Sequence, residues 1–176
     1  MSSVVAAITK QSETHKLNDS LKKLKKTMVL VGIAKGSTGD AREDGGPDNH
    51  LLGFVHEYGS PAAGIPPRPF LRPGVNSARE QIASGLEEAL KAALRDDADG
   101  MQAALDMTGI QAVSAVKSFM RDPSPPFVEL KPATLRNRHR SRMTKTKREN
   151  EVLNESVKPL LNTGALRNAI DYYIED

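Results

Sequence analysis

The sequence has no cysteine and no tryptophan, and three tyrosines and four phenylalanines are the only aromatic residues among 176. Without cysteine there is no disulfide, no thiolate nucleophile and no cysteine metal ligand, which fits a protein made in a reducing cytoplasm. A core poor in aromatics is built mainly from Leu, Val, Ile and Ala and buries a modest area per residue. We therefore expect part of the stability to come from partners.

Long apolar runs are also missing. No stretch is long enough to span a bilayer, and the N-terminal MSSVVAAITKQSETHK lacks the basic start and long apolar core of a signal peptide. We expect neither membrane insertion nor export. The length suits one ordinary domain, with or without extensions.

Catalytic and cofactor-binding patterns are missing too. The pair His56-Glu57 lacks the second histidine of a helical zinc motif, and no GK[ST] follows the glycine-containing GSTGD. His15, His50 and His139 are isolated in sequence, and there is no GxSxG. We predict that the protein is not an enzyme and that it takes no cofactor and no metal.

Charge is nearly balanced overall, at +3, but it is unevenly distributed. Residues 131–148 hold eight Lys or Arg, one His and no acid, whereas residues 87–99 hold five acids and two bases. Three interpretations of residues 131–148 are open. Their charges solvate a flexible linker, they contact an acidic face of a neighbouring copy, or they contact the phosphates of duplex DNA. The candidate contacts are Arg136, Arg138, Arg140, Arg142, Lys145, Lys147 and Arg148.

These arginines alternate, so on a helix they would point all round the axis, and no aromatic residue lies between them for base stacking. A nucleic-acid-binding adaptor that uses residues 131–148 is therefore an alternative function rather than the first one.

The N-terminal region 1–27 is predicted to form a basic amphipathic helix over about residues 14–26, followed by a strand at MVLVGIA, residues 28–34. The helical spacing is that of Leu17, Leu21, Leu24 and Met28. Residues 35–49 are rich in glycine and charge and have no periodicity, which predicts a long mobile loop.

Residues 50–58 predict a short helix closed by Gly59 in a left-handed conformation, with a strand as the alternative. The prolines that follow restrict the backbone, so residues 65–72 should form a rigid, polyproline-like arm. The residues expected to shape this segment are Gly59, Pro66, Pro67, Pro69 and Pro73, the last as the first residue of a helix.

Two apolar series step by three or four residues, from Val75 to Leu94 and from Met101 to Phe119. The acidic residues near Asp97 separate them, which predicts a helical hairpin or one interrupted helix over residues 74–121. A short helix over residues 133–142 and a polar linker at 142–157 should follow.

At the C-terminus, Thr163 is the candidate N-cap of one helical turn, and Gly164 turns the chain. Ile170, Tyr172 and Ile174 then alternate with polar residues, so we expect a half-exposed strand that pairs with residues 28–34. An exposed arm that adds to a neighbour's sheet is the alternative.

Together these elements predict an α+β fold. A small, mainly antiparallel sheet packs against long helices, with a long mobile loop and extended arms, in a single domain over residues 28–176.

Three segments resemble a known family. LLGFVHEYGSPAAGIPPRPFLRPGV resembles the signature of phage neck and tail-completion (head–tail joining) proteins, the group like the small HK97 head-tail protein, in which a Pro-Arg-Pro-Phe arm follows a short helix. SPPFVELKPATLRNRHR is similar to the family's proline-rich turn and Thr-Leu-Arg helix. KPLLNTGALRNAIDYYIED is similar to its closing motif, with Thr163, Gly164 and Leu166.

The resemblance implies a structural virion protein, located in the neck or tail and assembled in the host cytoplasm. It implies a ring of identical subunits, most often six, that joins the head connector to the tail. The partners would be other copies of the chain, the connector or head-completion protein and the tail-tube or tail-terminator protein. Duplex DNA would pass through the lumen, and no membrane would be involved.

We predict that Arg68 and Phe70 anchor the proline arm, with Phe70 in an apolar pocket and Arg68 paired with a carboxylate or with backbone carbonyls. The pocket would be formed by the long helices or by an adjacent subunit. The alternative is that both residues only fix the turn into the helix after Pro73. The further interface candidates are Glu57, Tyr58, Leu71 and Arg72.

Overall fold

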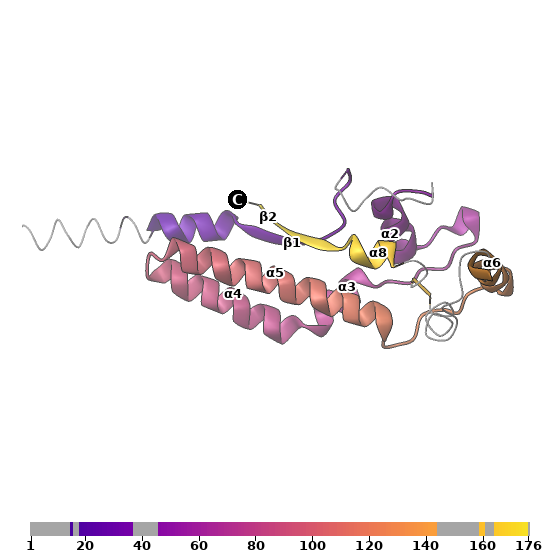
Figure 1. Ribbon diagram of the computed structural model, residues 1–176. Coiled ribbons are helices and arrows are strands. Elements are labelled where there is room, and N and C mark those ends of the chain that lie inside the picture. The colour runs from indigo at the N-terminus through magenta and orange to yellow at the C-terminus, as the bar shows by residue number, and fades with distance from the viewer. Residues whose placement is uncertain (1–14, 16–17, 37–45, 144–158, 161–163, 176) are drawn as a thin grey trace, which may run out of the picture. The chain divides into compact units, whose positions relative to one another are not determined.

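The computed structural model describes residues 15, 18–36, 46–143, 159–160 and 164–175, with the backbone alone at 139–143. The fold is α+β, as predicted: a two-stranded antiparallel sheet packs against long helices (Figure 1). The strands are β1 (Met28–Gly32) and β2 (Asp171–Glu175). The helices are α2 (Asn49–Tyr58), the 3-10 helix η1 (Pro61–Ala63), α3 (Leu71–Ser77), α4 (Arg79–Leu94), α5 (Ala98–Arg121), α6 (Pro132–Met143) and α8 (Ala165–Asn168).

The chain divides into two compact units. The hairpin unit comprises Met1–Val31, Ala78–Ala112 and Tyr172–Asp176, and the turn unit comprises Gly32–Ser77 and Val113–Asp171. The helical residues 18–26 belong with α4 and the first part of α5, because Leu24 packs against their shared core.

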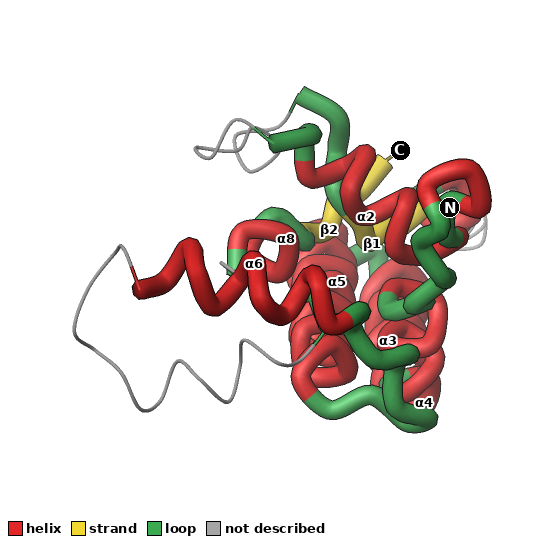
Figure 2. Tube along the Cα trace, turned by 90° about the vertical axis from the view of Figure 1, so that its right-hand side faces the viewer, coloured by secondary structure: helices red, strands yellow, loops and turns green. Residues whose placement is uncertain are grey.

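The core of the hairpin unit is built from small side chains on α4 and larger ones on α5. Leu24, Val29, Ala104 and Ile174 pack against it from the N-terminal helix, β1, α5 and β2. The buried cluster consists of Ala89, Ala92, Ala93, Met101 and Leu105. Small residues on α4 let the two helices approach closely, and they lie side by side in Figures 1 and 2.

The turn between α4 and α5 confirms the predicted helical hairpin. Asp96 has a positive φ of 59°, which an acidic residue tolerates in a tight turn. Asp97 precedes α5 and caps its start, because its Oδ1 accepts a hydrogen bond from the Gly100 N–H at 2.8 Å. Gly100 lies in the first turn of α5.

The two apolar series predicted from the sequence differ in how deeply the structure buries them. On α5 the series is the buried face, since Met101, Leu105 and Val116 are all 3% exposed or less. On α4 the buried residues are the alanines, and the leucines of the series remain exposed. Leu86, Leu90 and Leu94 are 44%, 41% and 49% exposed. The α4–α5 contact selects alanine because only small side chains fit between closely spaced helices.

The predicted C-terminal strand is confirmed, and it pairs with β1. Tyr172 and Ile174 are half-buried while Asp171, Tyr173 and Glu175 are exposed, which is the expected alternation. The Tyr172 hydroxyl donates to Asp106 Oδ1 of α5 at 3.0 Å. β2 is therefore tied to the hairpin by both packing and a hydrogen bond.

In the turn unit, α2 packs against α8, as Figure 2 also shows. Leu166 of α8 is buried and lies near Gly53 of α2. The N-cap of α8 is Gly164, with φ 79°, so the prediction of a Thr163 cap is wrong. The left-handed conformation explains why glycine occupies this position. Most of the predicted mobile loop and polar linker lies outside the described residues.

Candidate assembly surface at the turn between α2 and α3

The turn from α2 into α3 folds back on its own chain. α2 ends at Gly59, whose φ is 78°, and a Cβ there would lie 2.9 Å from the Pro67 nitrogen. Ser60 and Ile65 exchange two backbone hydrogen bonds of 2.9 and 3.0 Å. The Arg68 N–H then donates to the His56 carbonyl at 2.6 Å. The predicted arm is therefore held against the end of α2.

Glu57 caps α3. Its Oε2 accepts hydrogen bonds from the N–H groups of Phe70 and Leu71 at 2.8 and 2.9 Å, and its Oε1 accepts one from Arg72 at 3.2 Å. N–H groups at a helix start have no partner within the helix, and a carboxylate there also complements the helix dipole. Pro73 is the third residue of α3, not the first, and still lies in the turn where a missing N–H costs nothing.

Arg68 and Phe70 point into the unit. Arg68 is 5% exposed, and its guanidinium donates to the carbonyls of Val128 and Glu129 at 2.8 and 3.0 Å. Phe70 is 2% exposed, and its ring lies beside Gly53 of α2. The pairing with carbonyls is the one predicted, and the pocket for Phe70 is lined by its own chain. Both residues thus fix the turn rather than present a surface.

The outward face of α2 is apolar. Leu51, Phe54 and Tyr58 are spaced by three and four residues and are 49%, 61% and 60% exposed. The Phe54 and Tyr58 rings lie 4.9 Å apart. We call these three residues the α2 stripe. The interface candidates from the sequence included Tyr58 but not Leu51 or Phe54, although their helical spacing was the signal that could have found them.

The basic segment begins beside this turn. Lys131 Nζ donates to the Gly64 carbonyl at 2.9 Å, just before α6. On α6, Arg136 is exposed and Arg138 is half-buried. The side chains of Arg140 and Arg142, and all of Lys145, Lys147 and Arg148, lie outside the described residues. The structure thus brings the start of the basic segment next to the turn.

His56 is the one strongly shifted acid–base group described in this unit. Burial, followed by the positive charges of Arg68 and Arg138, lowers the pKa of its imidazole to about 4. Its Nδ1 is buried without a hydrogen-bond partner. The ring is therefore neutral at pH 7, and it adds no charge to the surface.

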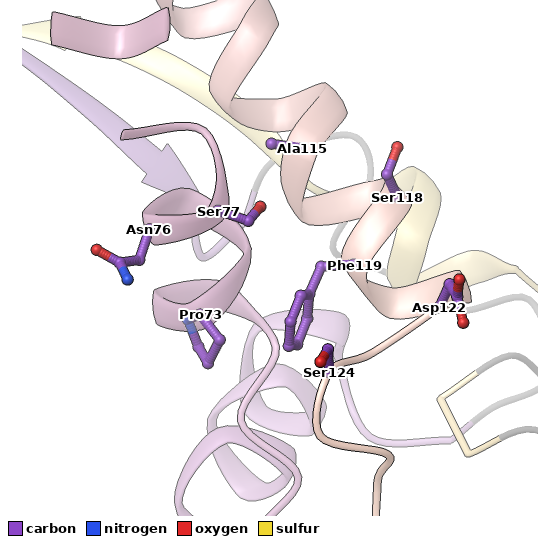
Figure 3. Close-up of a pocket in the computed structure, with 8 residues that line it drawn as sticks. All are labelled: Pro73, Asn76, Ser77, Ala115, Ser118, Phe119, Asp122 and Ser124. Atoms are coloured by element: carbon purple, nitrogen blue, oxygen red, sulfur yellow. The ribbon is translucent and has the colours of Figure 1, made fainter. Parts of the chain in front are cut away.

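A hollow of about 590 Å³ lies between α3 and the last turns of α5 (Figure 3). Its lining residues are Pro73, Asn76, Ser77, Ala115, Ser118, Phe119, Asp122 and Ser124. Phe119 packs edge-on against Phe127, with ring centroids 6.0 Å apart. Asp122 is the only ionisable side chain in this lining, and no histidine or lysine accompanies its serines, so the lining does not contain the nucleophile–base–orienter arrangement of a known catalytic site.

Within the described residues, no group of three His, Asp or Glu side chains could hold a metal ion. No helix in this part of the chain combines the length and the apolar character needed to cross a membrane. Comparison with protein-family models, curated proteins and solved structures found no match.

Proposed function

We propose that this protein is a structural subunit of a tailed-phage neck, which joins the head connector to the tail and performs no catalysis. The observation that carries this proposal is the α2 stripe. Exposed aromatic side chains at helical spacing are typical of protein–protein contacts, where Tyr and other aromatic residues contribute a large share of the binding energy. The sequence has few aromatic residues, so two of them side by side on one surface favour a docking role.

The turn behind the stripe supports the proposal. The end of α2 is held by the three hydrogen bonds that the Glu57 carboxylate accepts and by the one that the Arg68 N–H donates to the His56 carbonyl. A surface held in place before binding loses little conformational entropy when it docks. The same segment carries the resemblance to neck and tail-completion proteins.

The proposed assembly is a ring of identical copies, six by that resemblance, located in the virion and assembled in the host cytoplasm. Its neighbours would be the connector or head-completion protein on one side and the tail-tube or tail-terminator protein on the other. Duplex DNA would pass through the lumen. Repeated contacts of one kind between identical subunits close into such rings.

Imaging the assembled virion neck tests the proposal. We expect several symmetry-related copies of this chain between the connector and the tail. The double variant Phe54→Ala, Tyr58→Ala should fold normally but enter particles at least about tenfold less, because loss of two exposed hot-spot residues costs binding rather than stability. Glu129→Ala, an exposed change away from the stripe, is the control. A neck without this chain, or with a single copy, would contradict the proposal.

A nucleic-acid-binding adaptor is the second candidate, and α6 favours it, since Pro132–Met143 contains four arginines and no acid. Such a protein should lose affinity for duplex DNA steeply as salt rises, because phosphate contacts release counterions. A neck subunit should associate with its connector whether or not DNA is present. Titration of the chain with duplex DNA at several salt concentrations separates the two.

A further inference from the structure

Few side chains hold α6 to the rest of the turn unit. Of its described side chains, Leu135 and Arg138 are half-buried and the others are exposed. These two residues are three positions apart, so they lie on one face of the helix, and this is the face that meets the rest of the unit. Because no described side chain of α6 is fully buried, little packing energy opposes its detachment.

The segment just before α6 is anchored by hydrogen bonds from two charged side chains. The buried Arg68 guanidinium donates to the carbonyls of Val128 and Glu129 at 2.8 and 3.0 Å, and Lys131 Nζ donates to the Gly64 carbonyl at 2.9 Å. Hydrogen bonds from charged donors are stronger than those between neutral groups. The chain is therefore fixed as far as residue 131, and α6 begins at the next residue. A detached α6 would pivot there and stay tethered.

His56, near the end of α2, is affected by arginines of both parts. Burial first, and then the positive charges of Arg68 on the proline arm and of Arg138 on α6, lower the pKa of its imidazole. Among the described residues no carboxylate acts on the ring, since the neighbouring Glu57 binds the N–H groups that begin α3. The Nδ1 is buried without a hydrogen-bond partner, whereas a protonated ring donates from both nitrogens. The docked arrangement therefore suits the neutral ring alone.

Protonation of His56 would bring a third positive charge close to these two arginines, and α6 carries the charge that can move away. α2 is held by its packing against α8, and Arg68 is held by two carbonyls. Arg138 lies on the helix that only one half-buried face attaches. Repulsion between like charges in a partly buried site is larger than in water, and motion of the least firmly held charge relieves it.

We propose that α6 is a hinged helix, anchored at residues 128–131 and released from the turn between α2 and α3 when the His56 imidazole takes up a proton. Release carries Arg138 away from the ring and admits water to it. The basic helix then separates from the turn while the anchor holds. The inference does not depend on the proposed neck function, because it concerns contacts within one copy of the chain.

Release should occur as the pH falls below about 6.5, the pKa of an exposed imidazole. The pKa of the His56 imidazole is about 4 with α6 docked, and it returns toward 6.5 when the ring is exposed to water. Above pH 6.5 the ring is neutral in both arrangements. Below it the open arrangement binds a proton that the docked one does not, so opening is favoured. From pH 7.5 to pH 5 the equilibrium constant for opening should rise by up to about 25-fold.

Hydrogen exchange of the intact chain measures this opening. A detached helix of 12 residues is marginal in water, so the amides of α6 exchange once it leaves the turn. Corrected for intrinsic rates, their protection should fall by up to about 25-fold from pH 7.5 to pH 5, while the amides of α4 keep theirs. Unchanged protection of α6, or α6 amides already unprotected at pH 7.5, would overturn the inference. Loss of protection in α6 and α4 together would also overturn it, because that is global unfolding.

Variants identify the group that takes up the proton. His56→Gln does not titrate and should abolish the pH-dependent change in α6 protection. His50→Gln on the same helix is the matched control and should retain the change, as should His139→Gln on α6 itself. A response that persists in His56→Gln, or that is lost in either control, would overturn the inference.

A second measurement leaves His56 in place. The chain has no cysteine, so spin labels attached to the exposed positions of Leu51→Cys on α2 and Asn137→Cys on α6 report a single distance. The distance should lengthen and its distribution broaden between pH 7.5 and pH 5. The same distribution at both pH values would show that α6 stays docked and would refute the hinge.

Discussion

Individual residues of the turn between α2 and α3 stabilise the turn itself, and their position in the sequence motif did not reveal this role. Glu57 is a candidate for surface contact by sequence, yet its carboxylate accepts three backbone N–H groups at the start of α3. His56 beside it is half-buried, and its carbonyl accepts the Arg68 N–H. These residues determine how α2 is presented, so their substitution should first change stability.

Glu57→Ala should lower the free energy of unfolding by about 1–3 kcal/mol, because it removes a helix cap and leaves three donors unpaired. Denaturant unfolding followed by circular dichroism measures the change. Glu129→Ala is the control, since it removes an exposed carboxylate and keeps the carbonyl that Arg68 uses. An unchanged midpoint for Glu57→Ala would refute the capping role.

His56 should make the turn sensitive to acid. Its pKa is about 4 in the folded chain and 6.5 in a model compound, so above pH 6.5 the imidazole is neutral in both states. As pH falls from 6.5 toward 4, the unfolded chain binds a proton that the folded chain does not, and stability is lost. The loss is at most about 3 kcal/mol.

The comparison of wild type with His56→Gln over pH 4–7 checks this, because Gln does not titrate. The free energy of unfolding of the wild type should fall across this window relative to that of the variant. Parallel curves would mean that the imidazole is as accessible to protons in the folded chain as in the unfolded one.

At the scale of elements, the contact between α5 and β2 depends on one glycine. A Cβ at Gly109 would overlap the ring of Tyr172, whose hydroxyl is bonded to Asp106 on the same helix. The ring can lie this close to the helix backbone only because Gly109 has no side chain. Helix propensity alone would favour alanine at this position, so the packing of the strand outweighs it.

Gly109→Ala should therefore destabilise the chain by about 1–3 kcal/mol despite the better helix former, because overpacking displaces the Tyr172 ring. Thermal and denaturant unfolding measure the loss. Gly32→Ala is the matched control, since nothing lies within 4 Å of a Cβ there. Equal stability of the two variants would show that β2 can shift away at no cost.

At the scale of the molecule, two strands far apart in the sequence, β1 and β2, pair in one sheet. Residues 33–170 separate β1 from β2 in the sequence, and Ile174 of β2 packs against the same core as Val29 of β1. A two-stranded sheet is marginal without packing on one face, and the hairpin supplies that face. The C-terminal strand should thus belong to the core of the hairpin unit.

Deletion of residues 169–176 should abolish the cooperative thermal transition of the isolated subunit, because it removes β2 together with Tyr172 and Ile174. Differential scanning calorimetry measures this. Deletion of residues 2–8, which lie outside the described residues, is the comparison and should leave the transition in place. An unchanged transition together with lost assembly would instead favour an exposed arm that adds to a neighbour's sheet.

Local patterns in the sequence were enough to predict several of the elements. Apolar spacing predicts the α4–α5 hairpin, Gly59 predicts the end of α2, and alternation predicts β2 and its pairing with β1. These features depend on backbone preferences and on periodicity within a few residues. A single sequence is therefore enough to predict them. The α+β class followed from the same patterns.

Only the tertiary structure decided which faces are buried. The leucines of α4 are regular enough to suggest a core, but alanines face α5 because the helices pack too closely for larger side chains. Arg68 turns inward because the carbonyls of Val128 and Glu129, some 60 residues away, accept its hydrogen bonds. Spacing defines the faces of a helix, whereas the partner across the contact determines which face is buried, and no local pattern contains that partner.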